Sequence, residues 1–401
     1  MDGVKPQTLI LISHEYPPYV FGGVAFFSRR VAEWLSESGW RVVVIAGKAG
    51  FSERVSVSKV SDRLTVVRLY FPEIPPRWLL YGKVARGYVV RLIERGYSVV
   101  LSNAPLTGLV VPRSVRSKLH VITFFHGSIY SLLSLVYYTP LSDLTKISPL
   151  ELAYYSQLPL MSYLAKQDLL LSNSYVFVAR HVMEEYKDIY ADLAESVQSK
   201  GIIMYPGIEY TQLARLRMIV EKVDTGRIII AFVGRLYYTK GVVHAVKAVE
   251  ALLHNLNVKD AELWIFGKGP LEQWIKYYVR RKRDLRNRVK LFGFIERDKL
   301  ITLLARYVDV LLHPSLYEGA PIAIMEAQAL GIPVVAYDLP WAQEFIIDGV
   351  NGYKALCPDT FKLAESILKA VYVNPGKVML VAKRYDWREV FKILGNLLRE
   401  H

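Results

Sequence analysis

The sequence predicts an α/β protein with two domains, each built on a mainly parallel β-sheet that is covered by helices. At 401 residues, the chain is longer than a single hydrophobic core usually supports. Short apolar runs, which predict strands, are followed by loops and amphipathic helical segments. The run at 228–233, IIIAFV, is apolar at every position, as expected for a parallel strand covered on both faces.

Composition excludes several classes of protein. Apolar residues make up 52% of the chain and charged residues 22%, which allows sizeable cores and argues against disorder. The single cysteine, Cys357, offers no internal disulfide and no cysteine-rich metal site. The first apolar run is short and ends at His14-Glu15, so we expect no signal peptide, and no run approaches the length of a membrane span. We therefore expect a cytoplasmic protein.

The net charge of +14 is compatible with an anionic partner, such as nucleotide phosphates, anionic lipids or nucleic acid. The chain has no zinc finger, no aromatic-bearing RNA-binding sheet and no basic zipper arm. We therefore expect no nucleic-acid partner.

The first predicted unit is a strand, a glycine loop, a helix and a second strand. The strands are predicted at 9–13 and 42–46, and the helix at 25–38. Gly22 and Gly23 precede that helix, where a phosphate could approach the backbone. The Gly-x-Gly-x-x-Gly pattern of dinucleotide-binding proteins is absent, and a tight turn is the alternative explanation of the two glycines.

The rest of the first domain continues this pattern. Further strands are predicted at 66–70, 99–102, 119–125, 168–172 and 202–205. Helices are predicted at 78–95 and at 175–186, the second with Ser174 as its cap. The segment 128–164 is rich in Leu and Tyr and is divided by three prolines, which predicts broken helices over the first domain. His126 follows the strand at 119–125, and a structural histidine in a turn is the alternative interpretation.

Two loops of the second domain carry cations or glycines directly after a predicted strand. Arg235 and Lys240 follow the strand at 228–233; arginine can bind phosphate with two parallel hydrogen bonds, and lysine supplies a point charge. The alternative is that Arg235 and Lys240 are exposed loop cations that bind no phosphate. The predicted strand at 263–266 is followed by a glycine-rich turn, 267–270.

Two carboxylates follow the next predicted strand, 309–312. Glu318 lies in the loop after this strand, at the edge where open α/β sheets bind ligands. Glu326 lies in the predicted helix 320–330, among apolar residues. Carboxylates suit paired sugar hydroxyls, and the first amides of the helix suit an anion. The alternative is that Glu318 is merely a charge in a loop and that Glu326 lies on a solvated helix face.

Pro314-Ser315, Glu318-Gly319 and Glu326, eight positions after Glu318, resemble the donor-site signature of the retaining nucleotide-sugar glycosyltransferases of family four. The resemblance implies the GT-B architecture, in which two Rossmann-like domains face a cleft and a C-terminal helix crosses back to the first domain. It implies an acceptor-side domain at 1–206, a linker at 207–224, a nucleotide-sugar-binding domain at 225–380 and the crossing helix at 381–401.

The same resemblance assigns roles to residues. His126 would lie near the anomeric carbon, Arg235 and Lys240 would bind the diphosphate, Glu318 would contact the donor sugar, and Glu326 would bind the ribose. The other implied donor-binding residues are Gly22, Gly23, Gly234, Gly267, Gly269, Gly319, Ala320, Pro321 and Ile322. Two departures from the family pattern, Ala320-Pro321 in place of Phe-Gly and 340–344 in place of Gly-Gly-x-x-Glu, imply a phosphate or sugar cradle that differs in detail.

The resemblance thus implies a retaining glycosyltransferase that moves a sugar from a nucleotide diphosphate sugar to a glycan or a lipid-linked acceptor. Asp-x-Asp is absent, so we expect no metal ion and no cofactor besides the donor. One alternative is a nucleotide-sugar 2-epimerase of the same architecture. Another is a non-catalytic subunit that binds sugar nucleotides.

The segment 74–118 accounts for the positive charge of the first domain. It contains eight basic residues and one acidic residue, Glu94, beside apolar and aromatic side chains. Such a helix can lie at an anionic membrane interface, which predicts peripheral contact at the inner face of the membrane. The alternative is that its apolar side packs on the sheet of the first domain and its cations are solvated.

Overall fold

The computed structural model describes residues 7–20, 22–48, 50, 53–72 and 77–399, and the chain divides into two compact units. Unit 1 consists of Met1–Ile129, Ala153–Tyr205 and Phe391–His401. Unit 2 consists of Tyr130–Leu152 and Pro206–Val390. The segment Tyr130–Leu152, which we call the strap, is therefore a part of unit 2 whose chain neighbours on both sides belong to unit 1.

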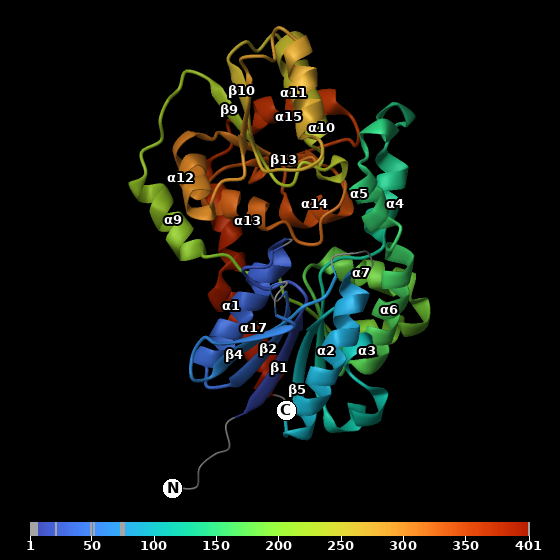
Figure 1. The fold of residues 1–401 in the computed structure, drawn as a ribbon. Helices are drawn as coiled ribbons and strands as arrows, with labels where there is room; N and C mark the ends of the chain where they lie inside the picture. Colours follow the sequence, from blue (N-terminus) through green and yellow to red (C-terminus); the bar gives the residue numbers. More distant parts are fainter. Residues whose placement is uncertain (1–6, 21, 49, 51–52, 73–76, 400–401) are drawn as a thin grey trace. The chain divides into compact units, whose positions relative to one another are not determined.

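Unit 1 contains an eight-stranded sheet with the order β3-β4-β2-β1-β5-β6-β7-β8, parallel except for the pair β3–β4 (Figure 1). Its strands are β1 (Thr8–Ser13), β2 (Arg41–Gly47), β3 (Val55–Lys59), β4 (Leu64–Leu69), β5 (Val99–Asn103), β6 (His120–Phe125), β7 (Ser174–Phe177) and β8 (Gly201–Ile203). After its first residue, β1 is buried along its whole length, so helices and loops cover both faces of the sheet.

The helices of unit 1 connect these strands. They are α1 (Gly23–Glu37), α2 (Arg77–Glu94), α3 (Thr107–Val110), η1 (Arg113–Lys118), α6 (Leu158–Leu171), α7 (Arg180–Ile189), η3 (Ala191–Leu193) and α8 (Ala194–Lys200). The C-terminal helix α17 (Trp387–Arg399) begins in unit 2 and ends in unit 1. There Phe391 stacks on Trp34 of α1, with ring centroids 4.6 Å apart. This confirms that the C-terminal helix returns to the first domain.

Unit 2 contains a six-stranded parallel sheet with the order β11-β10-β9-β12-β13-β14. Its strands are β9 (Ile228–Val233), β10 (Ala261–Phe266), β11 (Val289–Gly293), β12 (Val310–Leu312), β13 (Val334–Tyr337) and β14 (Gly352–Ala355). Every residue of β10 and β13 is buried. The continuous apolar runs in this half of the sequence are thus explained by a sheet covered on both faces.

The helices of unit 2 include two from the strap and the rest from the second half of the chain. They are α4 (Tyr130–Tyr138), η2 (Leu141–Lys146), α9 (Tyr210–Ile219), η4 (Tyr238–Lys240), α10 (Val242–His254), α11 (Glu272–Arg281), α12 (Arg297–Tyr307), α13 (Ile322–Ala329), α14 (Pro340–Phe345), α15 (Thr360–Ala370), α16 (Pro375–Ala382) and η5 (Lys383–Tyr385). Helix α5 (Pro149–Tyr155) begins in the strap and ends in unit 1.

The prediction of a strand at 168–172 was wrong. These residues form the end of α6 and the turn after it, the strand is β7, and α7 begins at Arg180 rather than after a Ser174 cap. A short apolar run fits a buried helix end as well as a strand.

The expected linker, 207–224, contains a helix, α9, which packs on α12 and α13. The strap is part of unit 2 rather than a cover of the first domain.

The apolar side of helix α2 packs inside unit 1. Its apolar side chains Trp78, Tyr81, Ala85 and Val89 are buried in the core of unit 1, and the Tyr81 hydroxyl donates to the carbonyl of Ile45 at 2.6 Å. For the helix side chains that the structure describes, the alternative interpretation of the segment 74–118 therefore holds: its apolar side packs on the sheet of the first domain. None of the helices in the described part of the chain is long and apolar enough to cross a bilayer.

Candidate functional site

The two loops predicted to bind the donor lie side by side at one edge of the sheet of unit 2. They follow β9 and β12, which are neighbouring parallel strands, and parallel strands end at the same sheet edge. Gly241 has a φ of +76°, and a Cβ placed on it would lie 2.0 Å from the carbonyl oxygen of Pro314. Only glycine fits this contact, which holds the loop bearing Lys240 against the loop bearing Glu318.

Lys240 and Glu318 form an ion pair in this loop cluster. Lys240 Nζ lies 2.7 Å from Glu318 Oε1, and the same oxygen lies 2.9 Å from Nε2 of His313. Burial by itself raises the pKa of the Glu318 carboxyl, but Lys240 and His313 outweigh it and hold that pKa well below its usual range. Glu318 is therefore ionised, and the prediction from sequence did not include His313, its second partner.

Arg235 and Glu326 are the other two charged residues that were predicted to bind the donor. Arg235 is exposed and lies over the ring of Tyr237, at 5.2 Å from its centroid. Glu326 of α13 accepts two hydrogen-bonded contacts from Arg297, at 2.8 and 2.7 Å, both at Oε1. Burial raises the pKa of the Glu326 carboxyl, and Arg297 opposes this effect only in part.

The segment Gly319-Ala320-Pro321-Ile322 leads from Glu318 into α13. Pro321 occupies the N-cap position, and its side chain makes no capping hydrogen bond to the first amides of this helix. An uncapped N-terminus offers N–H donors and a partial positive charge to an anion. These four residues thus connect Glu318 to the N-terminus of α13, and their predicted contact with the donor stays a prediction.

Gly267 and Gly269 have a packing role in the structure. A Cβ on Gly267 would lie 1.9 Å from the carbonyl oxygen of Gly234, and one on Gly269 would lie 2.6 Å from that of Leu236. The loop after β10 is therefore pressed against the loop that bears Arg235. Their predicted contact with the donor stays a prediction.

The other predicted site residues, His126, Gly22 and Gly23, belong to unit 1. His126 Nε2 donates to Asn103 Oδ1 at 2.8 Å, and Asn103 Nδ2 donates to Ser28 Oγ at 3.0 Å, which fixes the orientation of the amide. Burial, and then the neighbouring His14, lower the pKa of His126 to about 4. His126 is therefore neutral near pH 7, with its ring orientation set by Asn103, a residue that ends β5.

The glycine pair Gly22-Gly23 lies at the start of α1, and Phe21 before it is outside the described residues. The amide of Gly22 donates to Glu15 Oε2 at 2.9 Å. Among the described residues, its chain neighbours aside, no atom lies within 4 Å of a Cβ added to Gly22. The fold itself therefore leaves room for a side chain at position 22.

Two family models together match most of the chain. The model described as Glycosyltransferase Family 4 matches residues 21–191, and the one described as Glycosyl transferases group 1 matches residues 217–378. The second match contains Arg235, Lys240, Glu318 and Glu326. The chain belongs to the family 4 glycosyltransferases.

Relatives and solved structures agree with this assignment. Over 405 residues, the glycosyltransferase is 24% identical to glycogen synthase of Mycobacterium tuberculosis, covering 95% of this chain and 92% of the relative. It is 27% identical, over 44% of this chain and 42% of the relative, to the Escherichia coli UDP-Gal:alpha-D-GlcNAc-diphosphoundecaprenol alpha-1,3-galactosyltransferase. Sucrose-phosphate synthase from Thermosynechococcus elongatus has a TM-score of 0.72 at 20% identity, covering 98% of each chain. Anabaena HepE in complex with UDP-glucose has a TM-score of 0.67 at 16% identity, covering 98% of this chain and 100% of HepE. These likenesses show the GT-B fold.

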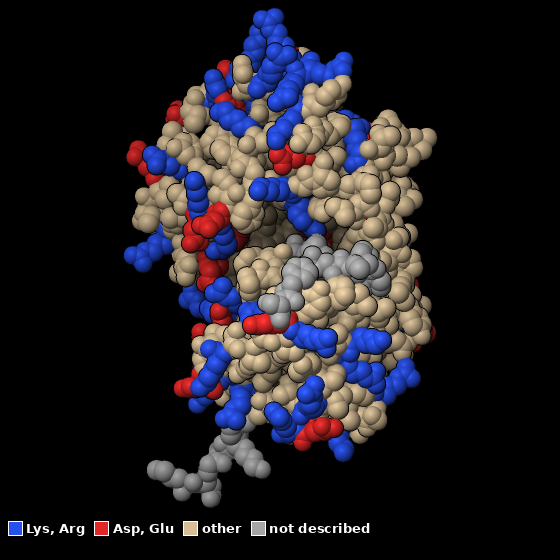
Figure 2. All heavy atoms as spheres, viewed as in Figure 1, with Lys and Arg blue, Asp and Glu red and all other residues tan. Residues whose placement is uncertain are grey.

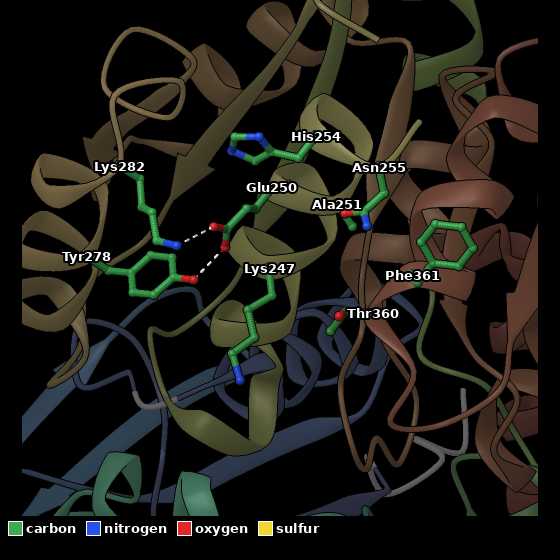
Figure 3. A pocket seen from close by; sticks show the side chains of 9 residues that line it. All are labelled: Lys247, Glu250, Ala251, His254, Asn255, Tyr278, Lys282, Thr360 and Phe361. Carbon is green, nitrogen blue, oxygen red and sulfur yellow. Dashed lines mark hydrogen bonds and ion pairs between the residues drawn. The ribbon is translucent and has the colours of Figure 1, made fainter. Parts of the chain in front are cut away.

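A cavity of about 680 Å³ in unit 2 of the glycosyltransferase is lined by none of the predicted donor residues (Figure 3). Glu250 of α10 pairs there with Lys282 at 2.9 Å and accepts from the hydroxyl of Tyr278. His254 lies 3.2 Å from Asp284. Because its charged groups neutralise one another, we assign no ligand to this cavity. Among the described residues, no group of three or more His, Cys, Asp or Glu side chains could hold a metal ion.

Proposed function

We propose that this glycosyltransferase moves a sugar from a nucleotide diphosphate sugar to its acceptor with retention of the anomeric configuration and without a metal ion. The observation that carries the proposal is the Lys240–Glu318 ion pair beside the uncapped N-terminus of α13. This arrangement presents a cation and backbone amides to a diphosphate, and a carboxylate to the sugar attached to it.

The reaction would be a front-face displacement. The bond between the anomeric carbon and the diphosphate oxygen breaks while the acceptor oxygen bonds to the same face, and the acceptor proton passes to the leaving oxygen. Arg235 and Lys240 stabilise the charge that develops on the diphosphate. An ammonium group has three donors, so Lys240 can contact the diphosphate while it remains paired with Glu318.

The other charged groups fit the remaining parts of a donor. The Glu318 carboxylate favours positive charge on the sugar as its bond to the diphosphate breaks. Both contacts from Arg297 are to Oε1 of Glu326, which supports the proposal that Oε2 accepts from a ribose hydroxyl. HepE, a structural neighbour, binds UDP-glucose, which supports a donor of this class.

A panel of nucleotide sugars tested in excess EDTA checks the proposal. We expect the correct donor to raise the melting temperature of the protein, because a ligand stabilises the folded state according to its affinity. We also expect slow hydrolysis of that donor without acceptor, and faster transfer with it. Activity that EDTA abolishes and Mg²⁺ or Mn²⁺ restores would contradict metal independence. Isomerisation of UDP-N-acetylglucosamine without acceptor would indicate the epimerase instead, and binding without any turnover would indicate the non-catalytic subunit.

We further propose that the acceptor is a lipid or lipid-linked, and that the strap, rather than α2, contacts the membrane. The three charged side chains of the strap, Asp143, Lys146 and Glu151, all turn into unit 2. Seven of its large apolar side chains are exposed, up to 81% for Tyr137 and 87% for Leu141. They are Leu133, Val136, Tyr137, Leu141, Leu144, Leu150 and Leu152.

Cations of the same unit complement this apolar surface. Figure 2 shows an uncharged surface over α4 and a cluster of Lys and Arg over α11. The exposed basic residues between positions 280 and 286, at the end of α11 and directly after it, are Arg280, Arg281, Lys282, Arg283 and Arg286. Leucine and tyrosine insert at a bilayer interface, and each nearby cation adds about 1 kcal/mol on anionic lipid. The relative that acts on a diphosphoundecaprenol acceptor supports such a substrate.

Vesicle co-sedimentation tests the proposed membrane contact. We expect binding to vesicles that contain phosphatidylglycerol and weaker binding to vesicles of phosphatidylcholine. Salt should weaken the binding to phosphatidylglycerol vesicles. The double variant Tyr137→Glu with Leu141→Glu should bind both vesicle types more weakly than the wild type. The matched control is Tyr372→Glu, an exposed tyrosine of unit 2 outside the strap, which should bind as the wild type does. Equal and negligible sedimentation with both vesicle types would contradict the proposal and favour a soluble acceptor.

A further inference from the structure

Two buried carboxylates of the strap contact the two residues that precede Lys240. Glu151 Oε1 accepts from both the amide and the hydroxyl of Thr239, each at 3.1 Å. The hydroxyl of Tyr238 donates to Asp143 Oδ2 at 3.1 Å. Glu151 is 3% exposed and Asp143 1%, so water competes little for either contact.

Asp143 is an ionised anchor for the strap. Both of its oxygens lie 3.2 Å from Lys247 Nζ, and Lys146 also donates to it. Burial raises the pKa of this carboxyl, but the two lysines outweigh it and lower that pKa. Figure 3 shows Lys247 pointing away from the Glu250–Lys282–Tyr278 group. A buried carboxylate requires such partners, and here the partners come from α10 and from the strap itself.

Thr239 joins the strap to both donor loops. Its amide and hydroxyl donate to Glu151, while its carbonyl accepts from the amide of Leu316 at 2.8 Å and from Ser315 Oγ at 3.2 Å. Lys240 follows Thr239 directly, and Glu318 lies two residues after Leu316. One set of buried hydrogen bonds thus runs from Glu151 through Thr239 to the segments that carry the Lys240–Glu318 pair.

We infer that Glu151 is a positioning residue of the transfer reaction, which acts through Thr239 to hold Lys240 at the leaving diphosphate. The inference rests on the proposed function. Glu151 binds a loop rather than the sheet core, and its other oxygen is held by the amide and hydroxyl of Ser148, each at 3.3 Å. Because the strap is inserted into the sequence of unit 1, the donor loop of unit 2 is completed by a segment from the acceptor-side half of the chain.

The test compares Glu151→Gln in two backgrounds. In the wild type, we expect Glu151→Gln to lower kcat by about 10-fold, since a small displacement of a catalytic group can cost this much or more. In a Lys240→Ala background, the same change should have almost no further effect, because the group that Glu151 positions is gone. Thr239→Ser, which keeps the amide and a hydroxyl, should stay near wild-type activity.

The matched control is Glu250→Gln, a carboxylate of the same unit paired with Lys282 and Tyr278. It should leave kcat unchanged. Donor hydrolysis and melting temperature are measured for every variant. An equal loss in both backgrounds would show a general structural role and overturn the inference, as would wild-type kcat in Glu151→Gln. A wild-type protein without transfer or hydrolysis would instead contradict the proposed function.

Discussion

Arg235→Ala and Lys240→Ala are each expected to lower kcat by about 10²-fold or more, the scale measured when one donor to a transition-state charge is removed. Both residues lie in the loop after β9 rather than in the core. Arg235 is exposed and lies over the ring of Tyr237. Its loss should therefore weaken the contact with the diphosphate while the fold persists.

Lys240→Ala has a second consequence, because Lys240 is one of two groups that hold the Glu318 carboxylate. Its removal should raise the pKa of Glu318 toward its usual range. The measurement is kcat and KM for the donor, with melting temperature as the check on folding. Lys259→Ala, at an exposed lysine of unit 2 outside these loops, is the control. Activity within about threefold of the wild type in either site variant would remove that cation from the mechanism.

The sequence predicts the elements whose signal is local. The strand β9 and its loop follow from a continuous apolar run that ends at Gly234-Arg235. The helix α13 follows from the largely apolar segment 320–330, which Gly331 and Pro333 end in the sequence. Parallel strands deliver their loops to one edge, so residues from β9 and β12 could be expected together. The Lys240–Glu318 pair confirms that these two loops meet.

The strap could not be predicted, because its partners are distant in sequence. Glu151 contacts Thr239 across 88 residues, and Asp143 contacts Tyr238 across 95. Periodicity reports which face of a helix is apolar but not where that face lies. In the strap the usual pattern is largely reversed, since the carboxylates Asp143 and Glu151 are buried while most of its leucines are exposed. For the same reason, the apolar side of α2 could not be assigned to core or membrane from sequence.

Glu318→Gln is expected to lower kcat by about 10²-fold, comparable to the loss of one catalytic hydrogen-bond donor, while KM for the donor changes less. Glutamine keeps the shape of the side chain but removes the negative charge. That charge orients Lys240 at 2.7 Å and, under the proposed mechanism, favours the positive charge that the sugar develops. A change confined to the transition state appears in kcat rather than in KM.

The pH dependence of stability provides an independent check on Glu318. A carboxyl whose pKa is lower in the folded than in the unfolded chain stabilises the fold above its unfolded pKa, about 4.3, and loses this contribution as the pH falls toward the folded value. Its folded pKa is held well below the usual range, so the wild type should be more stable than Glu318→Gln at about pH 7. The difference should shrink on acidification below about pH 4. Chemical denaturation at both pH values measures it, and a constant difference would show that Glu318 is not held as a charged partner of Lys240 and His313.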